Sequence, residues 1–239
     1  MQIAREGKPC YDKIIAQNGT YHMMNLAELY HQPGDHRGFL PGRVGTLEAC
    51  LTVPDNITGQ HIALLGHPHS LKGGSMQNKV VTTLAKMFKT LGVPSLRFNF
   101  RGVGQSAGQY DAGLGESDDM LDLAELCQAT LPQANLLFAG FSFGSFVAYR
   151  AASQIKHDVL LTVAPPVNHF DFTVFSEDPA PWILVQGDKD EVIPANIVLE
   201  FAEARDISVL YFNETGHFFH GKLIELQTRL LDVIGKIIA

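Results

Sequence analysis

The most informative candidate for a catalytic residue in this sequence is Ser142, which lies between two glycines in Gly140-Phe141-Ser142-Phe143-Gly144. The G-x-S-x-G pattern is typical of a very tight turn from a strand into a helix, which holds the serine hydroxyl exposed. Glycines on both sides remove the side chains that would collide across such a turn. Ser142 would stand at the start of the next helix, where amide N–H groups favour a developing oxyanion. The pentapeptide predicts a nucleophile at Ser142.

With 22 glycines in the chain, the pentapeptide alone could arise by chance, so its partners matter. A serine hydroxyl is a poor nucleophile unless a histidine removes its proton and an acid orients that histidine. Acids follow Ser142 at Asp188 and Asp190, and histidines come later at His217 and His220. Each pair comes just past an apolar run, in the order serine, acid, histidine that is expected for such a turn. These positions predict a catalytic triad, with both acids and both histidines open as members.

Apolar runs alternate with helical patterns from Val44 onward, which indicates a mostly parallel sheet with helices on both faces. Ligands of such sheets bind beyond the carboxyl ends of the strands, where Ser142 and its candidate partners fall. We expect strands at 46–53, 62–67, 95–100, 136–141, 159–163, 182–186 and 208–212, and helices at 76–91, 116–130, 143–154, 195–204 and 221–238.

The first 38 residues differ from the rest of the chain. They are polar, contain several histidines and are weakly periodic, and residues 31–36 are typical of a loop. No repeat, low-complexity stretch or Pro/Gly/Ser-rich linker divides the remainder. We therefore predict an N-terminal extension of unknown role at 1–38 and a single catalytic domain at 39–239.

Composition excludes several classes of protein. The 239 residues are 46% hydrophobic and 18% charged, which is enough for a sizeable core and excludes global disorder. A net charge of -7 argues against binding to nucleic acid or to an anionic membrane. Cys10, Cys50 and Cys127 are too few and too scattered for a disulfide framework. Because the first ten residues lack the apolar run of a signal peptide, we expect a cytoplasmic protein.

Several separate motifs together resemble the α/β-hydrolase fold serine hydrolases, from about Leu40 to the C-terminus. Within them the chain is similar to small, lidless bacterial enzymes that are related to dienelactone hydrolases and whose function is uncharacterised. In dienelactone hydrolases proper the nucleophile is a cysteine, and the subgroup usually has proline at Ser70. The motifs that carry the resemblance are Gly66-His67-Pro68-His69-Ser70-Leu71-Lys72-Gly73-Gly74-Ser75-Met76-Gln77-Asn78-Lys79, Arg97-Phe98-Asn99-Phe100-Arg101-Gly102-Val103-Gly104-Gln105-Ser106, the Ser142 pentapeptide, Gly187 to Pro194, and Gly216-His217.

The resemblance implies an α/β-hydrolase fold without a substantial lid, since 164–181 has no room for more than a short helix. It implies that Ser142 is the nucleophile, Asp190 the acid and His217 the base, with Asp188 and His220 as the alternatives. The oxyanion hole would use the backbone N–H of Phe143 and one from the loop after 62–67. In that loop His69 is the favoured donor and Ser70 the next, because Pro68 has no N–H.

Other constellations allow competing interpretations. His67 and His69 could ligate a metal, but in a turn after a strand they are more typical of loop order and pocket lining. The glycines at 102–108 hint at a dinucleotide loop, although the third comes one position late. We expect no metal and no cofactor.

Positive charge for an acidic substrate could come from Lys79, Arg97 and Arg101, or these residues could serve capping and surface pairing. Of the four phenylalanines beside Ser142 and His217, we expect two in the pocket wall and two in the core; they are Phe141, Phe143, Phe218 and Phe219.

The sequence therefore predicts a carboxylesterase-like serine hydrolase that cleaves small acyl esters through a covalent acyl-enzyme. An acyltransferase, thioesterase or peptidase on the same triad, and a non-catalytic binding module of the same fold, are the alternatives. The expected partner is a small-molecule acyl substrate, with neither nucleic acid nor membrane, and a homodimer is left open.

Overall fold

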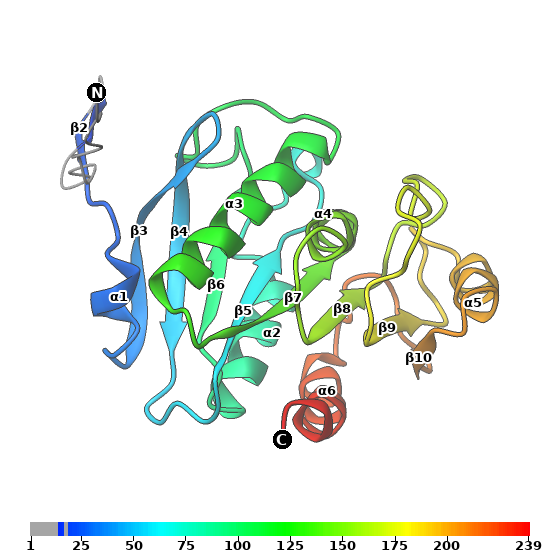
Figure 1. Ribbon diagram of the computed structural model, residues 1–239. Helices are drawn as coiled ribbons and strands as arrows, with labels where there is room; N and C mark the ends of the chain where they lie inside the picture. Colours follow the sequence, from blue (N-terminus) through cyan, green and yellow to red (C-terminus); the bar gives the residue numbers. More distant parts are fainter. Residues whose placement is uncertain (1–13, 17–18) are drawn as a thin grey trace, which may run out of the picture.

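An eight-stranded sheet forms the centre of the computed structural model, which describes residues 14–16 and 19–239 (Figure 1). Across the sheet the order is β10-β9-β8-β7-β5-β6-β4-β3. β4 runs antiparallel to β3 and β6, and all other neighbours are parallel, so β5 to β10 end at one common edge. The strands are β3 (Gly34–Gly42), β4 (Gly45–Val53), β5 (His61–Gly66), β6 (Ser95–Phe98), β7 (Asn135–Phe141), β8 (Val159–Val163), β9 (Trp182–Gly187) and β10 (Ser208–Phe212).

Helices cover both faces of this sheet (Figure 1). α3 (Leu114–Thr130) and α4 (Phe143–Ala152) enclose one hydrophobic cluster against it. α2 (Lys79–Thr90) and α6 (Leu223–Ile238) enclose a second cluster on the opposite face. α5 (Ala195–Glu203) lies beside β9 and β10. Since both faces are covered, every residue of β5 and β8 is buried, which explains their uninterrupted apolar sequences. The predicted mostly parallel α/β sheet is confirmed.

Helix α2 begins at Lys79, three residues after the predicted start at residue 76. The Asn78 side chain accepts a hydrogen bond from the Val80 N–H at 2.9 Å and so caps the helix. The Met76 N–H donates instead to Asn99 Oδ1 at 2.9 Å, which ties the preceding loop to the end of β6. Because Met76 is held in this way, the apolar pattern there marks a buried loop residue and not a helical turn.

Strand β3 corrects the prediction of a loop at residues 31–36, because it begins at Gly34. It pairs with β4 from Gly34–Val53 to Gly42–Gly45 and so crosses the boundary expected between residues 38 and 39. As an edge strand, it keeps residues 34–38 partly or fully exposed and lacks the apolar alternation that predicts a strand.

The segment before β3 also contacts the sheet. Met24 donates its N–H to the Phe39 carbonyl at 2.9 Å, and the side chains of Met24 and Leu26 are buried in the core on the α3 side. The short helix α1 (Leu26–Leu29) follows a small hairpin of β1 (Ile14–Ala16) and β2 (Gly19–Tyr21). Cys10 is one of residues 1–13, which lie outside the described residues.

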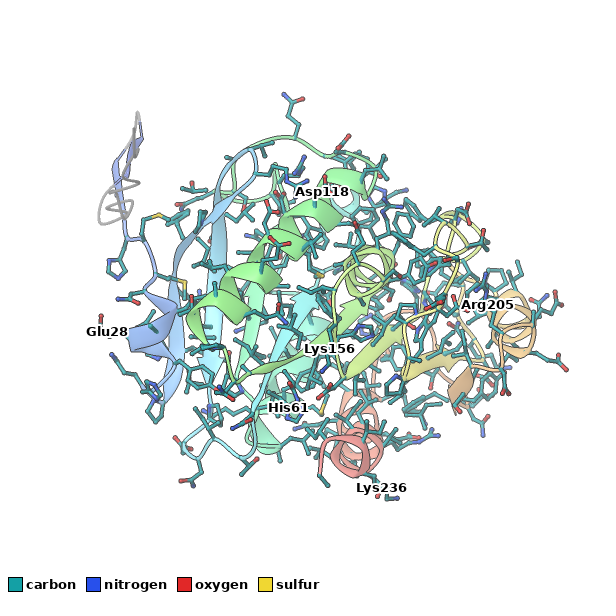
Figure 2. The ribbon with its side chains drawn as sticks, in the orientation of Figure 1. Glu28, His61, Asp118, Lys156, Arg205 and Lys236 are labelled. Carbon is teal, nitrogen blue, oxygen red and sulfur yellow. The ribbon has the colours of Figure 1, made fainter. Side chains whose placement is uncertain are left out.

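The segment 164–181 between β8 and β9 contains no helix and forms only turns, so the predicted absence of a lid is confirmed. Charged side chains gather on the outside, among them Asp118, Arg205 and Lys236 (Figure 2). Asp118 pairs with Arg43 at 2.7 Å, and Arg205 pairs with Asp178. Within the described ranges, no helix combines the length and the apolar character needed to cross a membrane.

His67, which directly follows β5, is a buried anchor for the loop after that strand. Its Nδ1–H donates to the Pro68 carbonyl at 2.7 Å, and its Nε2 accepts the Phe100 N–H at 2.9 Å. The ring also stacks on Phe100 with centroids 4.0 Å apart. Burial lowers the pKa of His67 to about 4, so the ring is neutral at neutral pH. His67 therefore orders this loop, which is one of the roles that the sequence predicted for His67 and His69.

This buried histidine makes stability depend on pH. The pKa of His67 is about 4 in the folded protein against about 6.5 in the unfolded chain, so the unfolded chain takes up the proton first. The stabilisation of the folded protein that this pKa difference provides is fully present above pH 6.5. As the pH falls towards 4 it is lost, which lowers the unfolding free energy by about 3 kcal/mol. The difference in unfolding free energy between wild type and His67→Gln should shrink by that amount between pH 7 and pH 4 in urea titrations. A constant difference would contradict this account.

Candidate active site

Ser142 lies at the turn between β7 and α4, with φ 53° and ψ -122°. Few residues other than glycine adopt a positive φ, so this conformation is strained and must be held by its surroundings. The Ser142 N–H donates to the Val163 carbonyl at 2.8 Å, which ties the turn to the end of β8. The Ser142 side chain therefore sits just past the edge where the parallel strands end.

Two glycines make this turn sterically possible. A Cβ atom at Gly140 would collide with the carbonyl oxygen of Gly144, and one at Gly144 would collide with the carbonyl oxygen of Gly66. Both obstacles are backbone atoms, so no side-chain rotation could relieve them. The start of α4 therefore packs directly against the end of β5.

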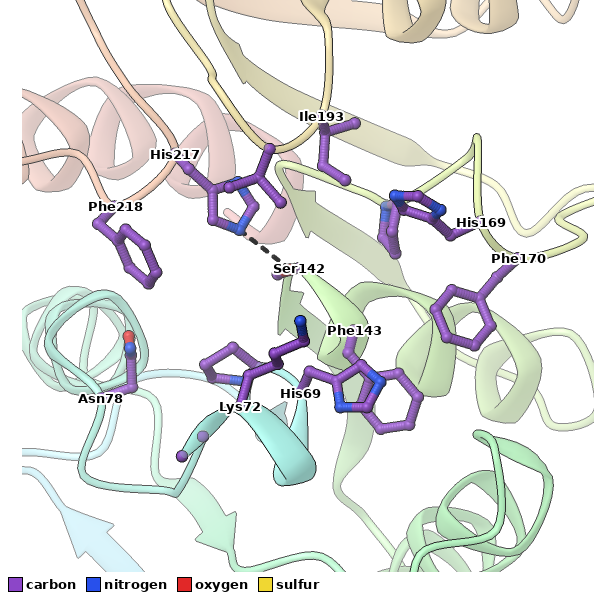
Figure 3. Close-up of a pocket in the computed structure, with 15 residues that line it drawn as sticks. His69, Lys72, Asn78, Ser142, Phe143, His169, Phe170, Ile193, His217 and Phe218 are labelled. Atoms are coloured by element: carbon purple, nitrogen blue, oxygen red, sulfur yellow. Dashed lines mark hydrogen bonds between the residues drawn. The ribbon is translucent and has the colours of Figure 1, made fainter.

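His217 and Asp190 continue from Ser142 in one series of hydrogen bonds (Figure 3). His217 Nε2 lies 3.1 Å from Ser142 Oγ, and His217 Nδ1 lies 2.9 Å from Asp190 Oδ2. A carboxylate can only accept, so the Nδ1 atom carries a proton, and Nε2 of the neutral ring is free to accept from the serine hydroxyl. The histidine is 2% exposed and the acid 8%, so bulk water competes little for these bonds.

The surroundings of Asp190 keep its carboxylate ionised. Oδ1 accepts the N–H groups of Val192 at 2.9 Å and Ile193 at 2.7 Å, and Gln186 Nε2 donates to Oδ2 at 3.2 Å. Burial raises the pKa of Asp190, but the hydrogen bonds from His217 and the two amides outweigh it and hold the pKa below its usual value.

The alternatives Asp188 and His220 lie away from this series. Asp188 Oδ1 accepts the Thr215 N–H at 3.0 Å, and this bond lowers the pKa of Asp188. The side chain of His220 is exposed and contacts the ring of Phe218. Asp188 therefore shapes the loop that carries His217, and Asp190 is the acid that touches its ring.

Glu191 is a residue that the sequence did not single out. Its Oε2 accepts the His217 N–H at 3.1 Å and so links the loop after β9 to the loop after β10. Acidic residues are common on surface loops, so the residue type alone indicates no role. Only the position of Glu191 within the Gly187–Pro194 motif could have identified it from the sequence.

A pocket of about 590 Å³ opens over Ser142 (Figure 3). Its walls come from the loops after β5, β8, β9 and β10, which meet at the common edge of the sheet. Most of the lining is apolar or glycine. The lining residues are Pro68, His69, Lys72, Gly73, Gly74, Asn78, Ser142, Phe143, Pro166, His169, Phe170, Val192, Ile193, His217 and Phe218.

The four phenylalanines beside the site divide as predicted. Phe143 and Phe218 line the pocket, whereas Phe141 and Phe219 are buried in the cluster under α2 and α6.

The two residues expected in the oxyanion hole both line this pocket. Phe143 is the first residue of α4, and His69 precedes the 3-10 turn η1 (Ser70–Lys72). Their rings lie 5.0 Å apart, and within the described residues neither backbone N–H donates to another protein group. The alternative donor, Ser70, does not line the pocket. Within the described residues, both amides are thus free of a protein acceptor.

The cations expected near the site lie elsewhere. Arg101 pairs with Asp119 at 2.8 Å, and Arg97 donates to Cys50 Sγ at 3.2 Å in the interior. Lys79 is exposed on α2 and does not line the pocket. The pairing alternative describes Arg101, whereas Arg97 is a buried residue that, in the described part of the chain, neither caps a helix nor pairs with the acids expected for it. The lysine in the pocket is Lys72, which the sequence did not reveal.

Neither cofactor interpretation gains support from the geometry. Among residues 14–16 and 19–239, no group of three metal-ligating side chains comes together. The glycines at 102–108 form a closed turn, in which the Gly102 N–H donates to Ala107 and Ser106 Oγ donates to the Asn99 carbonyl.

Comparison with known proteins finds close relatives, although no family model matches the chain. An uncharacterised protein of Rickettsia prowazekii is 36% identical over 188 residues, which cover 72% of this chain and 78% of that protein. A crystal structure of an α/β serine hydrolase without a lid from Xanthomonas campestris is similar with TM-score 0.82 and 39% identity, over 86% of this chain and 95% of that one. An α/β serine hydrolase homologue from Coxiella burnetii gives TM-score 0.80 and 40% identity, over 84% and 98% of the two chains.

The contact between Gly144 and Gly66 predicts a strong effect of one methyl group. Gly144→Ala should lower the unfolding free energy by about 3 kcal/mol or more, because the new Cβ meets backbone on the β5 side. Gly235→Ala in α6 is the matched control, since its Cβ would only touch Leu91 Cδ2 at 3.4 Å. Helix propensity predicts a small gain there, of about 0.5–1 kcal/mol. Equal effects of the two substitutions in chemical denaturation would contradict the steric argument.

Proposed function

The chain belongs to the α/β serine hydrolases without a lid, and from that premise we propose that it cleaves small acyl esters through a covalent acyl-enzyme. The observation that carries the proposal is the series of hydrogen bonds from Asp190 through His217 to Ser142 at the floor of the pocket. These three groups have the types and connections needed to activate a serine hydroxyl.

In the proposed first step, Ser142 Oγ attacks the ester carbonyl carbon while His217 Nε2 takes the hydroxyl proton. The Asp190 carboxylate holds the resulting imidazolium in place through Nδ1. When the tetrahedral intermediate collapses, His217 gives its proton to the leaving alcohol, and the acyl group stays on Ser142. A water molecule then attacks the acyl-enzyme while His217 Nε2 takes one of its protons. When this second tetrahedral intermediate collapses, His217 returns the proton to Ser142 Oγ and the carboxylic acid product leaves.

The backbone N–H groups of Phe143 and His69 would bind the oxyanion of each tetrahedral intermediate. Their support is that both line the pocket beside Ser142 and donate to no other protein group of the described chain. The positive end of the α4 dipole adds to the same effect, because Phe143 is its first residue. These donors are fixed before the substrate arrives, so they reorganise little during the reaction.

The shape of the pocket supports small, water-accessible substrates. A volume of about 590 Å³ suits a ligand of modest size. The segment 164–181 contributes Pro166, His169 and Phe170 to one wall but has no helix to close over it. Water therefore reaches the acyl-enzyme, which favours hydrolysis over transfer to an acceptor and short acyl groups over long lipids.

We extend the proposal to a reducing compartment such as the cytoplasm. Cys50 and Cys127 are both buried as free thiols. Burial raises the pKa of Cys127 to about 12, which keeps this thiol protonated and unreactive.

Replacing the nucleophile tests the proposal directly. Ser142→Ala should lower the turnover of p-nitrophenyl butyrate by about 10³-fold or more, because no other group forms the acyl-enzyme. A fluorophosphonate probe should label the wild type at Ser142 and leave the variant unlabelled, as read by mass spectrometry of peptides. Circular dichroism checks that the variant is folded. Unchanged turnover would refute the assignment of Ser142.

The two acids offer a matched pair of variants. Asp190→Asn should lower kcat by about 10³- to 10⁴-fold, because the amide disturbs the tautomer and charge balance of His217. Asp188→Asn keeps an oxygen for the Thr215 N–H, so its kcat should stay within about tenfold of wild type. Larger loss in Asp188→Asn than in Asp190→Asn would reverse the assignment of the acid.

A further inference from the structure

The lining of the pocket over Ser142 contains one lysine and no arginine, aspartate or glutamate. That lysine is Lys72. Asp190 lies behind His217, with its oxygens engaged by protein donors. Among the described residues, no ion pair engages the Lys72 ammonium group. A bound ligand would therefore meet a cation that has no protein counter-ion.

The histidine beside Lys72 adds no charge of its own. Burial lowers the pKa of His69, and the positive charge of Lys72 lowers it further, so the ring is neutral at neutral pH. Its Nδ1 accepts the Leu71 N–H at 3.3 Å, and its Nε2 lies 3.2 Å from the hydroxyl of Tyr110. The positive potential of this wall thus comes from Lys72.

A short turn connects Lys72 to the proposed oxyanion hole. The N–H groups of Lys72 and Gly74 both donate to the His69 carbonyl, at 3.0 and 3.1 Å. Gly73 closes the turn with φ 76°. Because His69 and Lys72 belong to one hydrogen-bonded turn, the backbone from which the Lys72 side chain extends is fixed relative to the amide that would bind the ester oxygen. Figure 3 shows the Lys72 side chain extending from η1 towards Ser142.

The charge of the whole protein makes this cation more informative. The chain carries a net charge of -7, so an anion approaching it is repelled on average. The other walls are mostly apolar, with Phe143, Phe170 and Phe218 among them. A carboxylate would supply the missing counter-ion to this lysine ammonium, which an uncharged ester cannot do.

We propose that Lys72 is a specificity residue, which selects esters that carry a carboxylate close to the scissile bond. This inference rests on the proposed ester hydrolysis and names its substrate class. The ester body would lie against the phenylalanine walls, and the carboxylate would accept a hydrogen bond from the Lys72 ammonium group. The lysine acts on binding and orientation and takes no part in proton transfer.

Two pairs of esters test this proposal, each pair matched in carbon skeleton but not in charge. In the first pair, monomethyl glutarate carries a carboxylate on the acyl side and methyl pentanoate is its neutral partner. In the second pair, 4-acetoxybenzoate carries the carboxylate on the alcohol side and 4-methylphenyl acetate is its neutral partner. Rates are measured by pH-stat titration at pH 7.5 and low salt. In at least one pair, the wild type should have the higher kcat/KM for the anionic ester, which also identifies the side.

The variants then assign the preference to Lys72. Lys72→Met should lower the ratio of kcat/KM for the anionic ester over its neutral partner by about 5- to 20-fold. Lys72→Glu should lower it further, and Lys72→Arg should retain most of it. The control is Lys79→Met, on the exposed start of α2 and outside the pocket, which should keep the wild-type ratio. Added 0.5 M NaCl should reduce the ratio of the wild type more than that of Lys72→Met.

Two results would overturn the proposal. One is a wild type that prefers the neutral ester in both pairs, and the other is a Lys72→Met variant with an unchanged ratio. If neutral esters are hydrolysed in either case, only the role of Lys72 fails and ester hydrolysis stands. If the folded wild type hydrolyses none of the four esters and the fluorophosphonate leaves Ser142 unlabelled, the proposed function itself fails.

Discussion

The close contact of backbone at the ends of β5 and β7 with the start of α4 is the constraint on which the site depends. Glycine at Gly66, Gly140 and Gly144 lets carbonyl groups approach where any side chain would collide. This packing holds Ser142 at φ 53° against its own conformational preference. The same turn places Phe143, the first residue of α4, in the lining of the pocket. One steric device thus positions both the proposed nucleophile and one proposed oxyanion donor.

The remaining groups depend on the parallel arrangement of the strands. Because β5 to β10 end at one edge, loops that are far apart in the chain meet over Ser142. Hydrogen bonds between these loops then set their relative positions: Asp188 holds Thr215, and Glu191 holds His217 through its backbone. On the other side, His67 and Asn99 fix the loop that carries His69 and Lys72. The ring of His217 is therefore held in position by neighbouring residues before any substrate binds.

The chain has a net charge of -7, whereas the lining of the pocket contains one lysine and no acidic residue. Asp190 stays ionised because buried donors outweigh its burial, while His67 stays neutral because burial dominates there. The site thus combines a buried anion behind His217 with a lysine, Lys72, that forms no ion pair within the described part of the chain. Such separation of charge favours the imidazolium that forms in the proposed reaction and an anionic group on the substrate.

Much of this protein follows from local sequence. Short apolar runs predicted β8 and β10 to the residue, and the glycine pattern around Ser142 predicted its turn, because these signals are local. The edge strand β3 escaped detection because its polar residues face solvent. Spacing alone left Asp188 and Asp190 open, and only the folded loops show which carboxylate reaches His217. The placement of Lys72 in the pocket, and of Arg97 and Arg101 outside it, was likewise decided by tertiary structure. The reason is that the direction of a long side chain depends on neighbours from other parts of the chain, which no local pattern encodes.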